Sequence, residues 1–223
     1  MLQIAGILKK LKVGEKVVYR GHADSEWELK PSIGRHYTND WKGVLGIEKK
    51  SLADFKKKSV PHLKHIPKSD IEWLCLMQHY GLSTRLLDFT TNPLIALFFT
   101  TDPAIKKDGE LITAEYSKRN EAVANNKLFN NDNNFSYHPP HITERIIGQN
   151  GIFVYSRVPN SPLNEKQISR IPIPKEVKAD IRKELVQLGI SNASLFPSID
   201  GICNDLNDNL IDKLCAKDIA KST

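Results

Sequence analysis

Polar residues able to bind a ligand or do chemistry gather in one short stretch, residues 78–91, between two apolar segments. The stretch contains an imidazole on His79, a guanidinium on Arg85, a carboxylate on Asp88 and several hydroxyls, among them those of Thr90 and Thr91. A guanidinium so close to a carboxylate can pair with it across a turn and only brace the loop. If the stretch is partly buried, the same groups become rigid fixtures of a pocket. The sequence leaves both interpretations of this polar loop open.

The two threonines lead into a helix that is expected to begin at Asn92-Pro93. Threonine at such a position commonly caps a helix. A helix N-terminus also presents unpaired N–H groups and a field that favours anions, so these hydroxyls could position a phosphate or a ribose. His79 falls at the end of the preceding helix, where the helix dipole favours it and where it could also line a pocket.

A second candidate, Arg20, follows the β-branched run Val17-Val18-Tyr19, which predicts a short strand that stops at Gly21. A strand-end arginine beside a glycine that permits close approach is typical of an anion clamp. A buried bracing role is the alternative.

Motifs of other reaction classes do not occur. The pairs His62/His65 and His138/His141 lack neighbouring ligand-type residues at metal-binding spacings, so no metal site is expected. The sequence has no G-x-S-x-G nucleophile, no Walker loop and no Rossmann glycine fingerprint. This argues against the familiar hydrolase and nucleoside-triphosphate chemistries.

Composition is that of a soluble globular protein with a modest basic excess. The formal net charge is +6, which helps attract a polyanion or a phosphorylated molecule without demanding one. The cysteines lack C-x-x-C spacing, lie in apolar helical patterns and are expected as core thiols of a reducing compartment: Cys75, Cys203 and Cys215. No signal peptide or membrane span is recognisable. A cytoplasmic protein without a membrane partner is therefore expected.

The elements that must position these residues follow from periodicity and capping signals. Apolar spacing predicts helices at residues 2–12, 41–60, 70–80, 93–100, 177–188 and 199–214. Strands are expected at residues 17–19, 109–116 and 151–158. Ser69 and Glu72 predict a capping box before the third helix. The Asn-rich residues 117–141 predict a long surface loop or flap.

Helices and strands mix along the whole chain, without an internal repeat or a linker. A single α+β domain over residues 1–223 is therefore expected, with a small mixed or antiparallel sheet flanked by helices.

Five segments of the chain, taken in order, resemble the FRG domain family, which is named for an aromatic-Arg-Gly motif, here Tyr19-Arg20-Gly21. The segments are VVYRGH (17–22), SEWELKPSIGR (25–35), LMQHYGLSTRLLDFTTNPLIALFF (76–99), RIIGQNGIFV (145–154) and SLFPSIDGI (194–202). The resemblance spans nearly the whole chain. It implies a single FRG-like domain and, because family members occur in bacteria and phages near mobile or defence-related genes, a role in bacterial or phage conflict.

A weaker resemblance, to ADP-ribosyltransferases of the Arg-Ser-Glu class, implies a possible fold and chemistry. Tyr19-Arg20-Gly21 is similar to their first-strand motif, and residues 89–99 are similar to their Ser-Thr-Ser strand and following helix. The third element, Glu-x-Glu, has no counterpart near residues 144–151, where the chain offers Glu144 and Gln149. Glutamine supplies no negative charge to an oxocarbenium-like state, so transfer should be slow or absent if Gln149 fills that position. Glu144, Asp88 and Glu110 are the alternatives.

The two resemblances imply a cleft that binds NAD or a related nucleotide and transfers ADP-ribose to a protein or nucleic-acid acceptor. The implied binding residues are Arg20, Gly21, His79, Tyr80, Arg85, Asp88, Thr90 and Thr91, and the implied catalytic residues are Glu144 and Gln149. Two other functions remain open: nucleotide or nucleic-acid sensing without catalysis, and protein interaction with a purely structural polar loop.

Overall fold

The computed structural model describes residues 2–35, 41–116, 118–119, 128–130, 133–141, 143–163 and 168–221. Its centre is a seven-stranded sheet in the order β4-β5-β6-β2-β1-β3-β7. The strands are β1 Val17–His22, β2 Leu86–Thr90, β3 Gly109–Glu115, β4 Lys118–Arg119, β5 Phe135–Tyr137, β6 Gly151–Tyr155 and β7 Ile168–Ile173. Neighbouring strands are antiparallel except for the parallel pair β4–β5. The sheet is therefore mixed, and the expected α+β class is confirmed.

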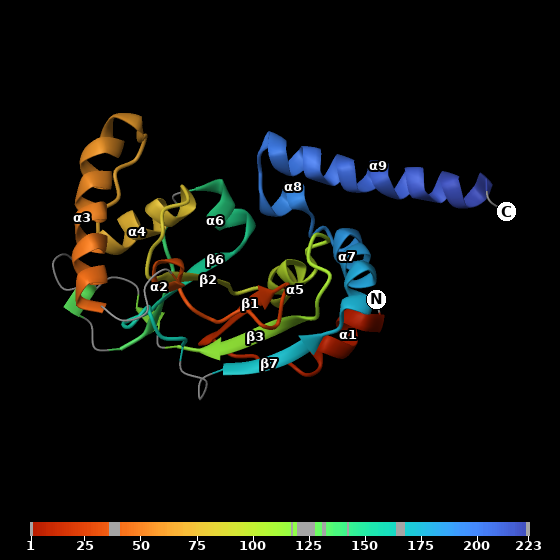
Figure 1. Cartoon of the computed structure of the whole chain (residues 1–223), viewed down its shortest axis with the longest axis horizontal. Helices are drawn as coiled ribbons and strands as arrows, with labels where there is room; N and C mark the ends of the chain where they lie inside the picture. Colours follow the sequence, from red (N-terminus) through yellow and green to blue (C-terminus); the bar gives the residue numbers. More distant parts are fainter. Residues whose placement is uncertain are drawn as a thin grey trace.

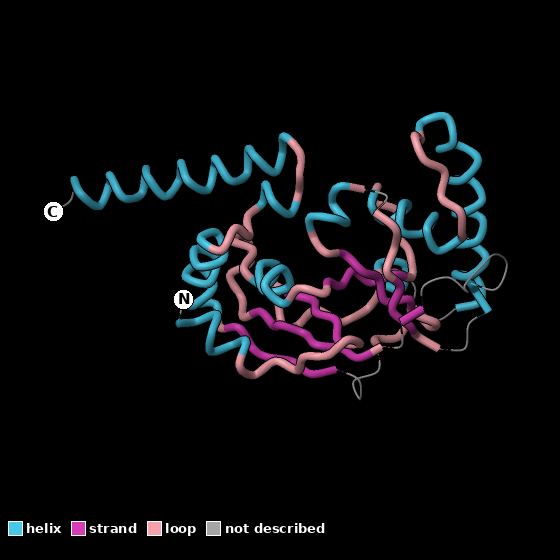
Figure 2. The backbone as a smooth tube through the Cα atoms, turned by 180° about the vertical axis from the view of Figure 1, so that it is seen from behind, coloured by secondary structure: helices cyan, strands magenta, loops and turns pink. Residues whose placement is uncertain are grey.

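The helices lie mainly on one face and at the two ends of this sheet. They are α1 Leu2–Leu8, α2 Ser32–Arg35, α3 Trp41–Ser59, α4 Asp70–His79, α5 Pro93–Thr100, α6 Glu144–Gly148, α7 Lys178–Gln187, α8 Asn192–Leu195 and α9 Ile199–Lys221. Figure 1 shows α4, α5, α6 and α8 over the same face. Both views show α9 extending away from the body at the end opposite α3 (Figures 1 and 2).

Apolar side chains form three clusters around the sheet. On the helix-bearing face, α4 packs against β2, β5 and β6, and α5 packs with α7 against β1 and β3. The third cluster lies on the other face and is covered by loop residues, among them Leu29, Tyr116 and Leu163. Leu87 and Phe89 of β2 belong to this third cluster, so Leu86, Asp88 and Thr90 face the helices.

The interpretation of the polar stretch at residues 78–91 as a loop is wrong where the stretch forms β2. Residues 86–90 form β2, which pairs with β6 along its whole length, from Leu86 opposite Tyr155 to Thr90 opposite Gly151. The pairing partner β6 lies far along the chain. The polar residues of this segment are not typical of a strand, and pairing within the assembled sheet is what stabilises it as one.

Residues 117–141 are not one long surface loop where the structure describes them. Leu128 and Phe135 are fully buried, and β5 lies inside the sheet next to β6. The remainder of that prediction, residues 117, 120–127 and 131–132, lies outside the described residues. The edge strand β7 was also not predicted, because it contains Pro172, which an edge position tolerates.

Helix boundaries agree with the capping signals in one case and differ in another. Asn92 caps α5 as expected, since its side-chain oxygen accepts from Leu94 N at 2.9 Å and Pro93 opens the helix. Ser69 is the N-cap residue of α4, but its hydroxyl donates to Glu72 Oε1 at 3.1 Å instead of accepting from the backbone. The prediction of a capping box at Ser69 and Glu72 is therefore wrong. The first helix also ends earlier than expected, at Leu8.

Helix α9 exposes apolar residues within 199–210, the part whose side chains are described, although the apolar helical pattern around Cys203 predicted a core position for that cysteine. Its exposed members are Ile199, Ile202, Leu206 and Leu210. Cys203 is likewise exposed, whereas Cys75 is buried, so the expectation of core thiols holds for Cys75 and fails for Cys203; the side chain of Cys215 lies outside the described residues. Among the described helices, none combines the length and apolar character needed to cross a membrane.

Candidate functional site

The sheet opens between its two middle strands. β1 pairs with β3 through six consecutive residues and β2 pairs with β6 through five, whereas β1 and β2 are in register at a single pair, Tyr19 and Thr90. Beyond that pair the strands diverge. Arg20 lies at this opening, where its Nη1 donates to the Asp88 carbonyl oxygen at 2.5 Å. This side-chain hydrogen bond thus takes the place of a backbone hydrogen bond between β1 and β2.

A cleft lies over this opening on the helix-bearing face. It consists of a cavity of about 150 Å³ and a smaller one of about 60 Å³. Both are lined by Asp88, Phe89, Arg145 and Gln149, so they are two parts of one depression. The larger part reaches Arg20, Gly21 and Thr90 and is bounded by α5, and the smaller part reaches Gln78 and His79 at the end of α4.

Helix α6 supplies the wall that faces α5 across the cleft. Thr143 caps this helix by accepting from Ile146 N at 3.3 Å. The Arg145 guanidinium lies over the Phe196 ring at 5.0 Å, and Gln149 Nε2 donates to the Leu195 carbonyl oxygen at 3.2 Å. Contacts with the α8 region therefore fix both side chains.

The cleft has a positive balance. Its described lining residues include two arginines, Arg20 and Arg145, and one acidic residue, Asp88. Burial lowers the pKa of Arg20, with Arg35 adding to this effect and Asp88 opposing it. Burial, followed by the field of Arg145, lowers the pKa of His79. His79 is therefore neutral at pH 7, and an anion that entered the cleft would meet a net positive field.

The structure brings together six of the residues selected from the sequence. Cleft-lining residues are Arg20, Gly21, His79, Asp88, Thr90 and Gln149. Tyr80, Thr91 and Glu144 are exposed and are not among the described lining residues. Arg145 was missed as a site residue, although it opens the segment RIIGQNGIFV on which the family resemblance partly rested.

Residues 15–109 match the family model of the FRG domain. The chain contains an FRG domain. The matched segment runs from the residues before β1 to the start of β3 and so includes Arg20, His79, Asp88 and Thr90. The wall formed by Arg145 and Gln149 lies outside the match. Searches of curated proteins and of solved structures found no match to the chain.

The glycine of the FRG motif is required by packing. A Cβ atom on Gly21 would lie 2.0 Å from the Ala96 carbonyl oxygen and 2.9 Å from Thr100 N. Both are backbone atoms of α5, so no side-chain movement could relieve the clash. At Gly21 the backbone of α5 therefore packs directly on β1. This close packing fixes the position of α5, which forms one wall of the cleft.

Arg85 of the FRG domain has a bracing role away from the cleft. It pairs with Glu48 of α3, not with Asp88 as the loop interpretation suggested: its Nε and Nη2 donate to Glu48 Oε2 at 2.8 and 2.6 Å. Its Nη1 donates to the Tyr155 hydroxyl at 2.8 Å, and the guanidinium lies over the Phe129 ring at 4.8 Å. The Arg85 and Glu48 side chains are 0% and 1% exposed, which makes them a structural pair.

Glu110, the other acidic alternative, is also engaged elsewhere. It accepts from His22 and from Arg170 on the sheet face opposite the helices. Asp88 is thus the carboxylate that the described cleft presents. Among the described residues, no group of three or more His, Cys, Asp or Glu side chains could hold a metal ion.

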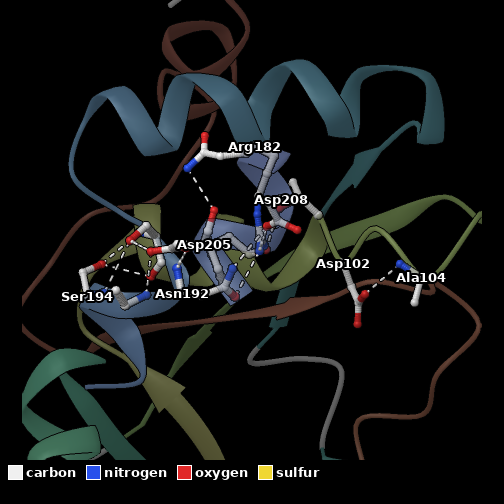
Figure 3. Close-up of polar contacts among 12 residues, drawn as sticks. Asp102, Ala104, Arg182, Asn192, Ser194, Asp205 and Asp208 are labelled. Carbon is white, nitrogen blue, oxygen red and sulfur yellow. Dashed lines mark hydrogen bonds and ion pairs between the residues drawn. The ribbon is translucent and has the colours of Figure 1, made fainter. Parts of the chain in front are cut away.

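A second cavity, of about 400 Å³, lies beside the FRG domain cleft between α5, α7, α8 and α9. Phe99 lines both this cavity and the cleft. Figure 3 shows polar contacts among residues of α7, α8 and α9 next to this cavity: Asp205 accepts from Ser191 Oγ and from the first N–H groups of α8. Arg182 lies over the Phe98 ring at 3.7 Å and within 3.8 Å of Asp208. These contacts attach the first turns of α9 to the body.

Proposed function

We propose that this protein binds NAD or a related nucleotide in the cleft over the β1–β2 opening and transfers ADP-ribose from it to a macromolecule. The supporting observation is the position of Arg20 at that opening, with Arg145 across the cleft. Guanidinium groups bind phosphate oxygens through paired hydrogen bonds and stay charged at all physiological pH values. Two of them in one cleft suit the two charges of a diphosphate.

The size of the cleft decides how much of the nucleotide it can hold. Pockets for ligands of this size usually measure about 300–1,000 Å³. The larger cavity, about 150 Å³, therefore takes a phosphate–ribose portion. The remainder of the ligand extends past Phe99 towards the 400 Å³ cavity or past Asp88 towards His79.

In the transfer reaction, Asp88 is the residue that stabilises positive charge on the nicotinamide ribose. The bond from ribose C1′ to the nicotinamide nitrogen breaks, and its electron pair leaves with the neutral nicotinamide. The developing oxocarbenium charge is stabilised by a nearby carboxylate. A nucleophilic oxygen or nitrogen of the acceptor then bonds to C1′ and releases its proton to water.

A second function, nucleotide binding without transfer, is favoured by Gln149. Its carboxamide has no charge and is held by the Leu195 carbonyl oxygen. A cleft with this residue in place of a glutamate can bind a ribose and yet lack the driving force for bond cleavage. The protein would then act in the cytoplasm as a nucleotide sensor in bacterial or phage conflict.

Binding is tested by calorimetric titration of the purified protein with NAD. Arg20→Ala should weaken binding about 10- to 100-fold, since hydrogen bonds to a charged group contribute about 1.5–3 kcal/mol. Lys64→Ala is the matched control, because it removes one positive charge from an exposed position outside the cleft lining. Equal NAD affinity in all three proteins would contradict the proposal.

Transfer is tested by incubating the protein with labelled NAD and cell lysate. Asp88→Asn should abolish labelling of macromolecules while NAD binding persists. Binding by the wild-type protein without any labelling would establish the sensor function instead. If neither occurs and Arg20→Ala only lowers the melting temperature, the protein-interaction alternative is supported.

A further inference from the structure

A chain of hydrogen-bonded polar groups, buried at His22 and Glu110, extends from Arg20 to the edge of the sheet. Arg20 Nε donates to His22 Nε2 at 3.1 Å, and His22 Nδ1 lies 3.0 Å from Glu110 Oε1. Arg170 Nη1 donates to the same Glu110 oxygen at 2.5 Å. Arg20 and His22 are two residues apart on β1, and Glu110 is opposite His22 in register on β3, so all three side chains leave the sheet on the face opposite the helices. The Arg20 guanidinium turns from there into the opening between β1 and β2, where Nη1 meets the Asp88 carbonyl oxygen and where the cleft begins.

Most of this face is apolar, which makes the polar chain conspicuous. Val18, Ile112 and Ala114 occupy neighbouring positions on β1 and β3 and are buried in the third apolar cluster. His22 and Glu110 are only 1% and 5% exposed. Burying such groups costs free energy even when they are paired. Well-packed apolar residues at such positions are often at least as stabilising as a buried polar pair, so stability alone does not explain this pair.

The hydrogen bonds fix the protonation of His22. An arginine Nε can only donate, so His22 Nε2 must carry a lone pair. The proton therefore resides on Nδ1, which donates to Glu110. Burial opposes ionisation of Glu110, but the hydrogen bonds from His22 and Arg170 outweigh this effect and lower its pKa. The imidazole is thus neutral, in one tautomer, and held between a carboxylate and Arg20.

We propose that His22, oriented by Glu110, is the positioning residue that holds Arg20 for phosphate binding; this inference rests on the proposed nucleotide site. Neither His22 nor Glu110 is among the described residues that line the cleft. His22 acts through Arg20: it binds Nε while the Asp88 carbonyl oxygen binds Nη1. The guanidinium is held from two directions, and its remaining N–H donors are available to an anion. Supporting hydrogen bonds of this kind decide how well a binding group is oriented.

Protonation of His22 would release Arg20. An imidazolium donates from both nitrogens, so Nε2 could no longer accept from Arg20 Nε, and two positive charges would face each other. The charged groups around His22 are Arg20 on β1, Glu110 on β3 and Arg170 on β7, and the Trp27 ring lies at 5.9 Å. Burial and the two arginines lower the pKa of His22, and Glu110 opposes them. The nucleotide affinity should therefore fall in acid, at pH values under the lowered pKa of His22, which is below the ordinary histidine value of about 6.5.

Two substitutions separate positioning from folding. His22→Gln places a carboxamide oxygen near the position of Nε2 and can still accept from Arg20. His22→Asn places its carboxamide near Nδ1 and can bind Glu110 but does not reach Arg20. Calorimetric NAD titrations of the full chain between pH 5.5 and 8 should show a loss of about 10-fold for His22→Asn at pH 7.5 and less than about 3-fold for His22→Gln, a range typical of supporting hydrogen bonds.

The pH dependence of the NAD affinity also tests the positioning role, because a purely structural role of His22 would not change it. Wild-type affinity should fall in acid more steeply than that of His22→Gln, because the glutamine does not titrate. His79 is present in both proteins, so it cannot account for the difference. Equal losses in the two variants, or identical pH profiles, would overturn the positioning role.

A measurement without ligand distinguishes this inference from the proposed function. Nitrogen-15 NMR of the histidine side chains should show His22 at pH 7.5 as the neutral tautomer protonated at Nδ1. An imidazolium, or a proton on Nε2, would overturn the inference whatever the ligand result. Failure of the wild-type protein to bind NAD would instead overturn the proposed function, and the tautomer would still decide whether His22 orients Arg20.

Discussion

The three residues of the Tyr-Arg-Gly motif have three different tasks. The Tyr19 ring is buried in the apolar cluster that β1 shares with α1, α5 and α7, and its hydroxyl donates to the Lys12 carbonyl oxygen at 2.9 Å. Arg20 bridges the opening of the sheet, and Gly21 admits the backbone of α5. The sequence predicted an anion-binding arginine beside a glycine at a strand end. It could not assign the role of His22, because nothing local indicates that Arg20 binds this residue two positions further on.

The partner of Arg85 could not be predicted from the sequence. The guanidinium was expected to face either Asp88 or a pocket, since only nearby residues could be considered. Its partner Glu48 lies 37 residues away on α3. A chain pattern cannot specify which buried carboxylate a buried arginine will meet when the two are brought together by packing.

Removing this pair should strongly destabilise the fold. Arg85→Ala leaves Glu48 buried without its cation, and breaking a buried ion pair from one side typically costs about 3–5 kcal/mol. Urea denaturation at pH 7 measures the change in the free energy of unfolding. The control is Glu115→Gln, which breaks a pair with Lys12 whose side chains are both more than half exposed, and it should have little effect. If the two variants have the same stability, Arg85 does not brace α3 against the sheet.

At the scale of elements, β1 and α5 are coupled through Gly21. Gly21→Ala should destabilise the protein by at least about 1–3 kcal/mol, because the added methyl group must displace helix backbone. Gly46→Ala in the exposed part of α3 is the matched control, since no atom lies within 4 Å of the added Cβ. This second change should stabilise the protein by up to about 1 kcal/mol through helix propensity. Thermal unfolding measures both; a neutral Gly21→Ala would refute the close packing.

The sequence predicted elements whose signals are local and missed those that depend on distant partners. Helical periodicity and the Asn92-Pro93 cap located α3, α4, α5 and α7, and β-branched runs located β1, β3 and β6. β2 was missed because Arg85, Asp88 and the threonines made it resemble a loop, although pairing with β6 makes it central. The wall of the cleft at Arg145 is fixed by contacts with α8, which no periodic pattern reveals.

At the scale of the whole molecule, the buried His22 and the half-buried His79 make stability depend on pH. The pKa values of His22 and His79 are both lowered in the folded protein, chiefly by burial. Between their folded pKa values and about 6.5 the unfolded chain binds more protons than the folded one, so stability rises with pH in this window. Their contribution is fully present above about pH 6.5 and is lost as the pH falls below it.

Urea denaturation at pH 5 and pH 7.5 tests this dependence. The wild-type protein should be less stable at pH 5, and His22→Gln should show a smaller difference between the two pH values. The exposed histidines His62 and His65 provide the control, because their joint replacement by glutamine should leave the difference unchanged. An equal pH dependence in wild type and His22→Gln would show that His22 does not become protonated over this range.

The sheet divides beside Arg20, the residue that we propose to bind phosphate, and a structure with bound nucleotide tests this proposal most directly. Crystals of the full chain grown with NAD or ADP-ribose should show the diphosphate within hydrogen-bonding distance of the Arg20 guanidinium, with His22 Nε2 still bound to Arg20 Nε. The ligand should also contact Arg145 from the opposite wall. A diphosphate bound elsewhere, with the cleft over β1 and β2 unchanged, would contradict the account.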